Sequence, residues 1–88
     1  MKVSGMYKLR YSPQIPKDIK KLSKLDAKSI KLAIEAKLTV DPIEYGKPLR
    51  YSLKGMRRLR VGSYRVVYNI IQDTVYIEAI AHRKDIYK

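Results

Sequence analysis

The stretch that decides the fold is residues 56–71, MRRLRVGSYRVVYNII. Apolar and polar residues alternate on both sides of Gly62-Ser63, and alternation with a period of two is typical of half-buried β-strands. A glycine at the first of two central positions fits a type II′ turn. The stretch therefore predicts a β-hairpin with strands at residues 57–61 and 64–71.

The two-residue turn also predicts the register of this hairpin. Six apolar and aromatic side chains share one face, which is expected to be covered by helices: Leu59, Val61, Tyr64, Val66, Tyr68 and Ile70. The other face gathers Arg58, Arg60 and Arg65, with Arg60 directly opposite Arg65. Like charges at opposed positions destabilise a strand pair by up to about 1 kcal/mol. The presence of this unfavourable pair predicts that the arginine face binds an anion.

A second two-residue turn at Gln72-Asp73 predicts a third strand at residues 74–81, with Arg65 opposite Ile80. In this register Tyr76, Glu78 and His82 join the arginine face. The covered face then receives Val75, Ile77, Ala79 and Ala81. A slip by one residue would bury Glu78 and expose Val75, so the hydrophobic pattern favours this register.

The chain before the hairpin predicts one strand and two helices. The strand covers residues 7–11, and Ser12 caps a helix over residues 13–22. Asp26 is expected to cap a second helix, which ends near residue 39 because Asp41-Pro42 disfavours the helical conformation. Residues 42–54 are expected to form a loop, and residues 83–88 either a helical turn or an irregular tail.

The predicted order is β-α-α-β-β-β in a single domain over residues 1–88. This order predicts an α+β fold in which a helical hairpin packs on one face of a largely antiparallel four-stranded sheet. The other face of the sheet, with the arginines, is expected to remain open.

The charge of the chain indicates the class of partner. Twenty Lys and Arg residues against eight Asp and Glu residues give a net charge of +12, which predicts a nucleic acid or an acidic protein as partner. Seven basic residues and no acidic residue lie between Lys47 and Gln72. Besides the three arginines of the hairpin face, we expect the others to bind RNA: Lys47, Arg50, Lys54 and Arg57.

The composition also excludes several classes of site. There is no cysteine, which excludes disulfides and thiolate zinc sites, and the single histidine, His82, cannot build a metal site by itself. No metal and no cofactor are therefore expected. No apolar run approaches the roughly 20 residues of a membrane span, and the first twelve residues lack the apolar core of a signal peptide. These features predict a cytoplasmic protein.

The segments DPIEYGKPL, LKGMRRLRVGSYRVVYNI and HRKDIY resemble the RelE/ParE superfamily of toxin–antitoxin toxins. The resemblance covers nearly the whole chain and implies a compact fold like that of microbial ribonucleases. RelE-type members cleave mRNA in the ribosomal A site and inhibit translation. ParE-type members share the fold but inhibit DNA gyrase and are not nucleases. A degenerate toxin that acts only as a binding module is a third alternative.

The resemblance implies roles for five residues of this chain. Arg58 and Arg60 match a basic pair of the RelE-type site, Arg65 matches the arginine on the next strand, and Arg83 and Tyr87 match its C-terminal arginine and tyrosine. His82 is a candidate for proton transfer, because an unperturbed imidazole has a pKa of about 6.5. Glu78 is expected to act as a structural counter-ion. The predicted catalytic set is Arg60, Arg65, His82, Arg83 and Tyr87, and Arg58 joins the RNA-binding set.

A toxin of this kind implies two partners. One is mRNA on the ribosome. The other is a short acidic antitoxin, expected to fold on binding and either to wrap the helices or to cover the arginine face.

Overall fold

The computed structural model describes residues 6–49 and 55–86. In chain order, its elements are β1 (Lys8–Tyr11), α1 (Gln14–Lys20), α2 (Lys24–Ala33), the π-helical segment η1 (Ile34–Leu38), α3 (Pro42–Tyr45), β2 (Lys47–Pro48), β3 (Arg57–Val61), β4 (Tyr64–Ile71), β5 (Thr74–His82) and α4 (Arg83–Ile86). The four predicted strands are confirmed to within one residue at either end. In these ranges no helix is long and apolar enough to cross a membrane.

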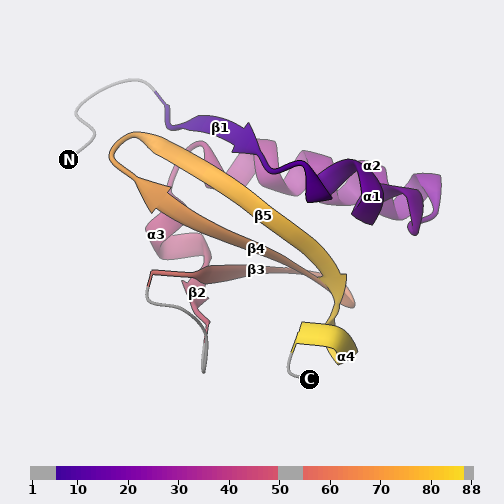
Figure 1. Cartoon of the computed structure of the whole chain (residues 1–88). Coiled ribbons are helices and arrows are strands. Elements are labelled where there is room, and N and C mark those ends of the chain that lie inside the picture. Colours follow the sequence, from indigo (N-terminus) through magenta and orange to yellow (C-terminus); the bar gives the residue numbers. More distant parts are fainter. Residues whose placement is uncertain (1–5, 50–54, 87–88) are drawn as a thin grey trace.

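The strands of the described residues form a five-stranded sheet in the order β1-β5-β4-β3-β2 (Figure 1). β1 runs parallel to β5, and the other neighbouring pairs are antiparallel. The predicted α+β class, with helices on a largely antiparallel sheet, is confirmed. The predicted number of four strands is wrong, because β2 lies in the segment expected to be a loop. Two residues are too few to show the alternation that identifies a strand.

The helices begin at hydrogen-bonding side chains, as the sequence indicates, although one cap differs from the prediction. The Ser12 hydroxyl accepts the Gln14 N–H at 3.3 Å at the start of α1. The second helix is capped by Ser23 rather than by Asp26: the Ser23 hydroxyl accepts the Asp26 N–H at 3.0 Å, and the helix begins at Lys24. Serine and aspartate are equally good caps, so their order along the chain does not decide between them.

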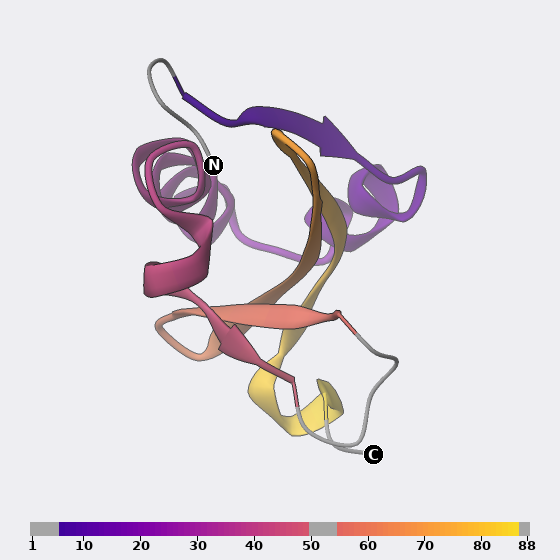
Figure 2. The same cartoon turned by 90° about the vertical axis from the view of Figure 1, so that its left-hand side faces the viewer.

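The chain after η1 forms a further short helix in place of the predicted loop. Asp41, which was expected only to end the preceding helix, accepts the Glu44 N–H at 3.1 Å and caps α3. Pro42 occupies the first turn of α3, where its missing N–H costs nothing. In Figure 2, α2 and α3 lie on one side of β3, and α4 lies on the other side.

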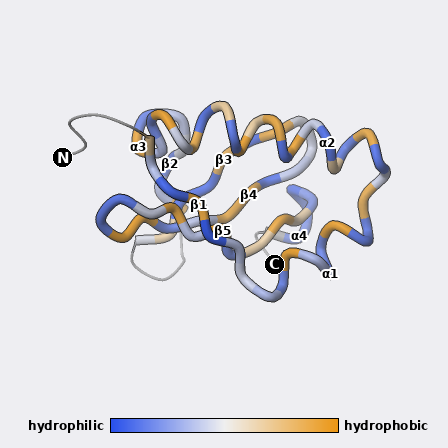
Figure 3. Tube along the Cα trace, turned by 90° about the horizontal axis from the view of Figure 1, so that it is seen from above, coloured by the Kyte–Doolittle hydropathy of each residue, from blue (hydrophilic) through white to orange (hydrophobic). Residues whose placement is uncertain are grey.

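The core lies between the sheet and the helical layer. Figure 3 shows hydrophobic and hydrophilic residues alternating along α2, as in an amphipathic helix. The buried apolar cluster draws on α1, α2, η1, β3, β4 and β5: Ile15, Ile30, Ile34, Leu38, Leu59, Val66, Tyr68, Val75, Ile77 and Ile80. The alternation in residues 56–71 therefore separates the core from the opposite face of the sheet as predicted.

Candidate functional site

The β3–β4 hairpin has the predicted register. Gly62 has a φ of 59°, the left-handed region that a type II′ turn requires at this position. Arg60 lies opposite Arg65, and Leu59 lies opposite Val66. Because Leu59 and Val66 are buried in the core, Arg60 and Arg65 share the face of the sheet that is turned away from α2.

Strand β2 brings one more cation to this surface. Lys47 pairs with Arg58 across β2 and β3, so the two side chains leave the sheet on the same face. Lys47 and Arg60 are exposed, and Arg58 is half-buried. We call the surface formed by Lys47, Arg58, Arg60 and Arg65 the basic face. It joins one cation from the predicted loop to the three hairpin arginines.

Arg65 is held within the basic face rather than displayed on it. Only 7% of the residue is exposed, and Nη1 donates to the carbonyl oxygens of Gly62 at 3.1 Å and Tyr64 at 3.0 Å. The prediction that this side of the sheet stays open is wrong at this end. Helix α4 lies there, and the Arg83 N–H donates to the Ser63 carbonyl at 2.8 Å (Figure 2).

The register of β5 departs from the prediction at Glu78. A β-bulge leaves this residue without a partner, so that Val67 pairs with Ala79 although Tyr68 pairs with Ile77. Arg65 therefore lies opposite Ala81 and not opposite Ile80. Before the bulge the predicted faces hold: Tyr76 pairs with Asn69 on the side of the basic face, while Val75 and Ile77 are buried. After the bulge the two faces are exchanged: Ile80 is buried in the core, whereas Ala79 and Ala81, which were expected on the covered face, lie on the side of the basic face.

The bulge also moves His82 away from the arginines. His82 pairs with Tyr64, and their rings make an edge contact with centroids 5.5 Å apart. Its Nδ1 accepts the Lys84 N–H at 3.2 Å. The ring lines a hollow of about 460 Å³ on the helical side, together with Asp26 and Ser29 of α2. The expectation that His82 shares a face with Arg65 is therefore wrong.

Contacts from the corner between β1 and α1 hold the bulge in place. The Ser12 N–H donates to the Ile77 carbonyl at 2.9 Å, and the Ser12 hydroxyl donates to the Glu78 carbonyl at 2.8 Å. The Ile80 N–H donates to Oδ2 of the buried Asp18 at 2.9 Å. These groups lie more than 60 residues apart in sequence, which is why a strand-by-strand prediction misses them.

Arg57 lies on the helical side of the sheet, opposite Tyr68. Its Nη2 donates to the carbonyl oxygens of Ile43 at 2.7 Å and Gly46 at 3.0 Å, at the two ends of the last turn of α3. Burial raises the pKa of Tyr68, and the Arg57 guanidinium beside the hydroxyl offsets part of this rise. Arg57, which was expected to contact RNA, therefore lies on the opposite side of the sheet from the basic face.

The remaining predicted residues are only partly placed. Arg83 is exposed at the start of α4, whose backbone is tied to the β3–β4 turn. Arg50, Lys54 and Tyr87 lie outside the described residues. Within the described ranges, no group of three or more His, Cys, Asp or Glu side chains lies together in a way that could hold a metal ion.

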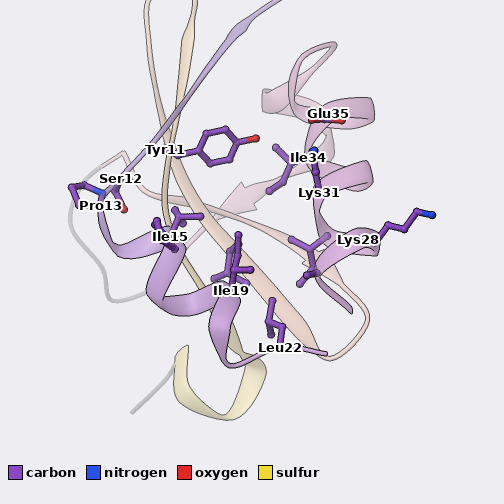
Figure 4. A pocket seen from close by; sticks show the side chains of 14 residues that line it. Tyr11, Ser12, Pro13, Ile15, Ile19, Leu22, Lys28, Lys31, Ile34 and Glu35 are labelled. Atoms are coloured by element: carbon purple, nitrogen blue, oxygen red, sulfur yellow. The ribbon is translucent and has the colours of Figure 1, made fainter. Parts of the chain in front are cut away.

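An apolar groove of about 960 Å³, which the sequence does not reveal, lies between α1 and α2 (Figure 4). Its floor and walls are aliphatic and aromatic: Tyr11, Ile15, Ile19, Leu22, Ile30, Ile34 and Ile80. Lys28 and Lys31 lie along the α2 side, with Glu35 beyond them. Burial, and secondly the Glu35 carboxylate, raise the pKa of Tyr11. Ile15 of α1 is buried, whereas Ile19 is 42% exposed, so the apolar side of this helix is only partly covered by the core.

The family described as "ParE toxin of type II toxin-antitoxin system, parDE" has a sequence model that matches residues 9–87 of this chain. The chain belongs to the RelE/ParE family of type II toxins. It is 35% identical over 85 residues to Toxin RelG of Mycobacterium tuberculosis, which covers 93% of this chain and 97% of RelG.

Solved structures of toxin–antitoxin complexes share the fold of this toxin. A chain of the RelBE2 complex from Mycobacterium tuberculosis superposes with a TM-score of 0.82 at 31% identity, covering 96% of this chain and 98% of that chain. A chain of the RelB–RelE complex from Methanococcus jannaschii gives a TM-score of 0.70 at 27% identity, covering 89% and 94% respectively. The RelE-like fold implied by the sequence resemblance is therefore confirmed.

The toxin brings together part of the set that the resemblance implied. Arg58 and Arg60 lie side by side on β3 with Arg65 across from Arg60, and Lys47 extends this group on β2. A basic residue beside Gly46 in a short Gly-Lys-Pro segment is the signal that Lys47 offered in the sequence. Residue type does not distinguish Arg57 from Arg58, but the alternation along β3 places Arg57 on the opposite face of the sheet.

Proposed function

We propose that this toxin is an endoribonuclease that cleaves mRNA on the ribosome and thereby stops translation. The observation that carries the proposal is the basic face, where Lys47 lies opposite Arg58, Arg60 follows on the same face of β3, and the largely buried Arg65 lies opposite Arg60. Planar guanidinium groups bind phosphate oxygens in pairs, and a lysine adds a point charge. Such a surface fits the backbone of one RNA strand. The proposal places the toxin in the cytoplasm, where mRNA is translated.

The basic face supports one part of the cleavage chemistry. When the 2′-oxygen of a nucleotide attacks the adjacent phosphorus and the 5′-oxygen leaves, negative charge grows on the phosphate oxygens. Arg58 and Arg60 are placed to stabilise this charge, and Arg65, fixed by its hydrogen bond to Gly62, lies opposite Arg60 on the next strand. We propose that this cleavage proceeds without a metal ion, with the ribosome supplying much of the alignment between the reacting oxygen and phosphorus.

His82 receives no part in the proposed proton transfer at the basic face. A general base must come within hydrogen-bond reach of the proton that it removes. His82 packs on Tyr64 on the other side of the sheet, and its Nδ1 already accepts a backbone N–H. We therefore propose a charge-stabilising site, and not a histidine-based one.

Arg60→Ala tests the proposal directly, because Arg60 is exposed and its loss leaves the core intact. We expect cleavage of ribosome-bound mRNA, followed by primer extension, to slow by about 100-fold, the scale of removing one transition-state charge contact. Lys20→Ala on α1 is the matched control, because it removes one exposed positive charge from the helical layer. Equal rates for Arg60→Ala and the wild type, or equal losses for both variants, contradict the assignment.

A second candidate function follows from the family that matches the chain. ParE-type toxins inhibit DNA gyrase, and the same basic face could bind DNA or gyrase without cutting a nucleic acid. A gyrase supercoiling assay run beside the primer extension separates the two functions. Inhibition of supercoiling without mRNA cleavage selects the second. If expression of the toxin does not arrest growth, both give way to a simple binding module.

We propose that an acidic antitoxin binds the groove between α1 and α2 as an amphipathic helix. The groove is apolar inside, and Lys28 and Lys31 lie along one rim, so it fits a helix with one apolar and one acidic side. The RelBE2 and RelB–RelE structures similar to this toxin are complexes with antitoxins. Ile19→Asp should weaken antitoxin binding by more than tenfold in calorimetry, whereas Arg60→Ala should not. The reverse pattern places the antitoxin on the basic face.

A further inference from the structure

Lys47 occupies its position on the basic face through a very short strand. β2 has two residues, which pair with Arg57 and Arg58 of β3, and directly after it the Leu49 N–H donates to the Met56 carbonyl at 3.0 Å. The preceding helix α3 has four residues. An isolated helix of this length is far too short to be stable in water, because nucleation outweighs the few hydrogen bonds formed. Other contacts must therefore hold this part of the chain.

Those contacts come from two side chains on the helical side of the sheet. Nη2 of Arg57 donates to the Ile43 and Gly46 carbonyls at 2.7 and 3.0 Å. The hydroxyl of Tyr68 donates to the Pro42 carbonyl at 2.6 Å. Arg57 and Tyr68 are cross-strand partners on β3 and β4, and Tyr68 is fully buried. Together they take three backbone carbonyls within five residues and hold α3 against the hairpin.

Gly46 shows how closely the chain approaches this pair. A Cβ atom at Gly46 would lie 1.6 Å from the Tyr68 hydroxyl oxygen and 2.6 Å from its ring carbon Cζ. The ring is fully buried, so it cannot turn aside. The backbone therefore passes directly over the Tyr68 hydroxyl, and the next residue is Lys47.

We propose that Arg57 and Tyr68 are positioning residues that fix Lys47 beside Arg58 on the basic face. They act from the opposite face of the sheet, by holding the backbone carbonyls of α3 and Gly46. Arg57, expected from its charge to contact RNA, instead places the amine of another residue. The inference rests on the proposed function insofar as it gives Lys47 an RNA phosphate to bind.

A salt titration of RNA binding distinguishes positioning from direct contact. Each phosphate contact on a single strand contributes about 0.7 to the slope of log affinity against log salt. We expect Lys47→Ala to lower this slope by about 0.7, measured by fluorescence anisotropy with a short single-stranded RNA. Arg57→Lys should lower it equally although it keeps the charge, because an ammonium group cannot span both carbonyls as the guanidinium does. The double variant should lose no more than either single variant.

Two outcomes of the titration overturn the proposal. If Arg57→Lys keeps the wild-type slope while Lys47→Ala lowers it, the guanidinium does not position Lys47. If the double variant loses about 1.4, the two residues contribute independent contacts. Loss of stability alone lowers the active fraction but leaves the slope unchanged, so a purely structural role gives a different result.

Hydrogen exchange tests the same inference without RNA. The Leu49 N–H is protected by its bond to Met56 only while β2 stays on β3. Arg57→Lys and Tyr68→Phe should each speed its exchange by about tenfold, whereas Arg58→Lys on the other face should leave it unchanged. Wild-type exchange in both variants overturns the proposal. If exchange changes but Lys47→Ala has no effect on the salt slope, the positioning stands and the proposed RNA contact of Lys47 fails.

Discussion

The two strand pairs on either side of β4 follow different rules. The β3–β4 pair keeps one register throughout, set by the two-residue turn at Gly62-Ser63. The β4–β5 pair also begins at a two-residue turn, at Gln72-Asp73, but it changes register halfway along, between Val67 and Tyr68. Turn chemistry therefore fixes where a hairpin starts, and contacts from elsewhere decide whether the register continues.

The difference lies in what each pair contacts along its length. The β3–β4 pair has an alternating apolar face, and its regular register turns the whole of that face toward the core. β5 lies between β4 and β1, and the corner after β1 presents hydrogen-bonding groups that only a bulged strand can meet. The Glu78 carbonyl turns toward Ser12, and the Ile80 N–H turns toward Asp18. The buried carboxylate of Asp18 thus has a use that local sequence does not reveal.

Removing Asp18 should have the largest effect on this contrast. Asp18→Leu leaves the Ile80 N–H without its acceptor inside the protein, which should lower the free energy of unfolding by about 2–3 kcal/mol. Asp18→Asn keeps one acceptor oxygen and should lose about 1 kcal/mol. Urea unfolding with an unchanged m-value measures both losses.

The register gives a second readout for the Asp18 variants. NMR cross-strand contacts of Arg65 with Ala81 report the bulge, and contacts with Ile80 report the regular ladder. We expect Asp18→Leu to populate the regular ladder and Asp18→Asn to keep the bulge. If Asp18→Leu retains full stability and the contact with Ala81, another group holds the bulge.

A substitution in the β3–β4 turn should lower the free energy of unfolding by less than Asp18→Leu does, and it should leave the strand register unchanged. Gly62→Ala places a side chain at a φ of 59° and should lower the free energy of unfolding by about 1 kcal/mol. Ser63→Ala, at the other turn position, should cost less than about 0.5 kcal/mol. Cross-strand contacts between Arg60 and Arg65 should persist in both variants. A shifted register in Gly62→Ala would show that the turn alone sets the pairing.

Most of the fold follows from local patterns in the sequence. The alternation around Gly62 predicts the core positions Leu59, Val66 and Tyr68, and all three are buried. The helices follow from apolar spacing and from capping residues, with an error of three residues in the cap where Ser23 and Asp26 compete. The elements that the sequence does not reveal, α3 and β2, are too short for any periodicity and are held by Arg57 and Tyr68 from far along the chain.

The candidate site also has one part that the local sequence predicts and another part that depends on contacts from elsewhere in the chain. The shared face of Arg58, Arg60 and Arg65 follows from the turn, because pairing and alternation are properties of one hairpin. The burial of Arg65 beneath α4 and the position of His82 depend on packing and on the bulge. The sequence does not separate Arg57 from its neighbour by residue type, although the alternation of the strand places the two on opposite faces.

The smallest expected effect concerns the repulsion between Arg60 and Arg65, which lowers the stability of the hairpin. Arg60→Thr removes the cation opposite Arg65 and should raise the free energy of unfolding by about 0.5 kcal/mol, while RNA binding weakens. Arg10→Thr on β1 is the matched control, because Arg10 is an exposed strand residue that lies opposite Tyr76, and its loss relieves no such repulsion. The gain for Arg60→Thr should shrink as salt screens the pair. Equal stability changes in both variants would mean that strand propensity, and not repulsion, accounts for the gain. A gain specific to Arg60→Thr, together with weaker RNA binding, would show that the arginine pair lowers stability and serves the binding of an anion.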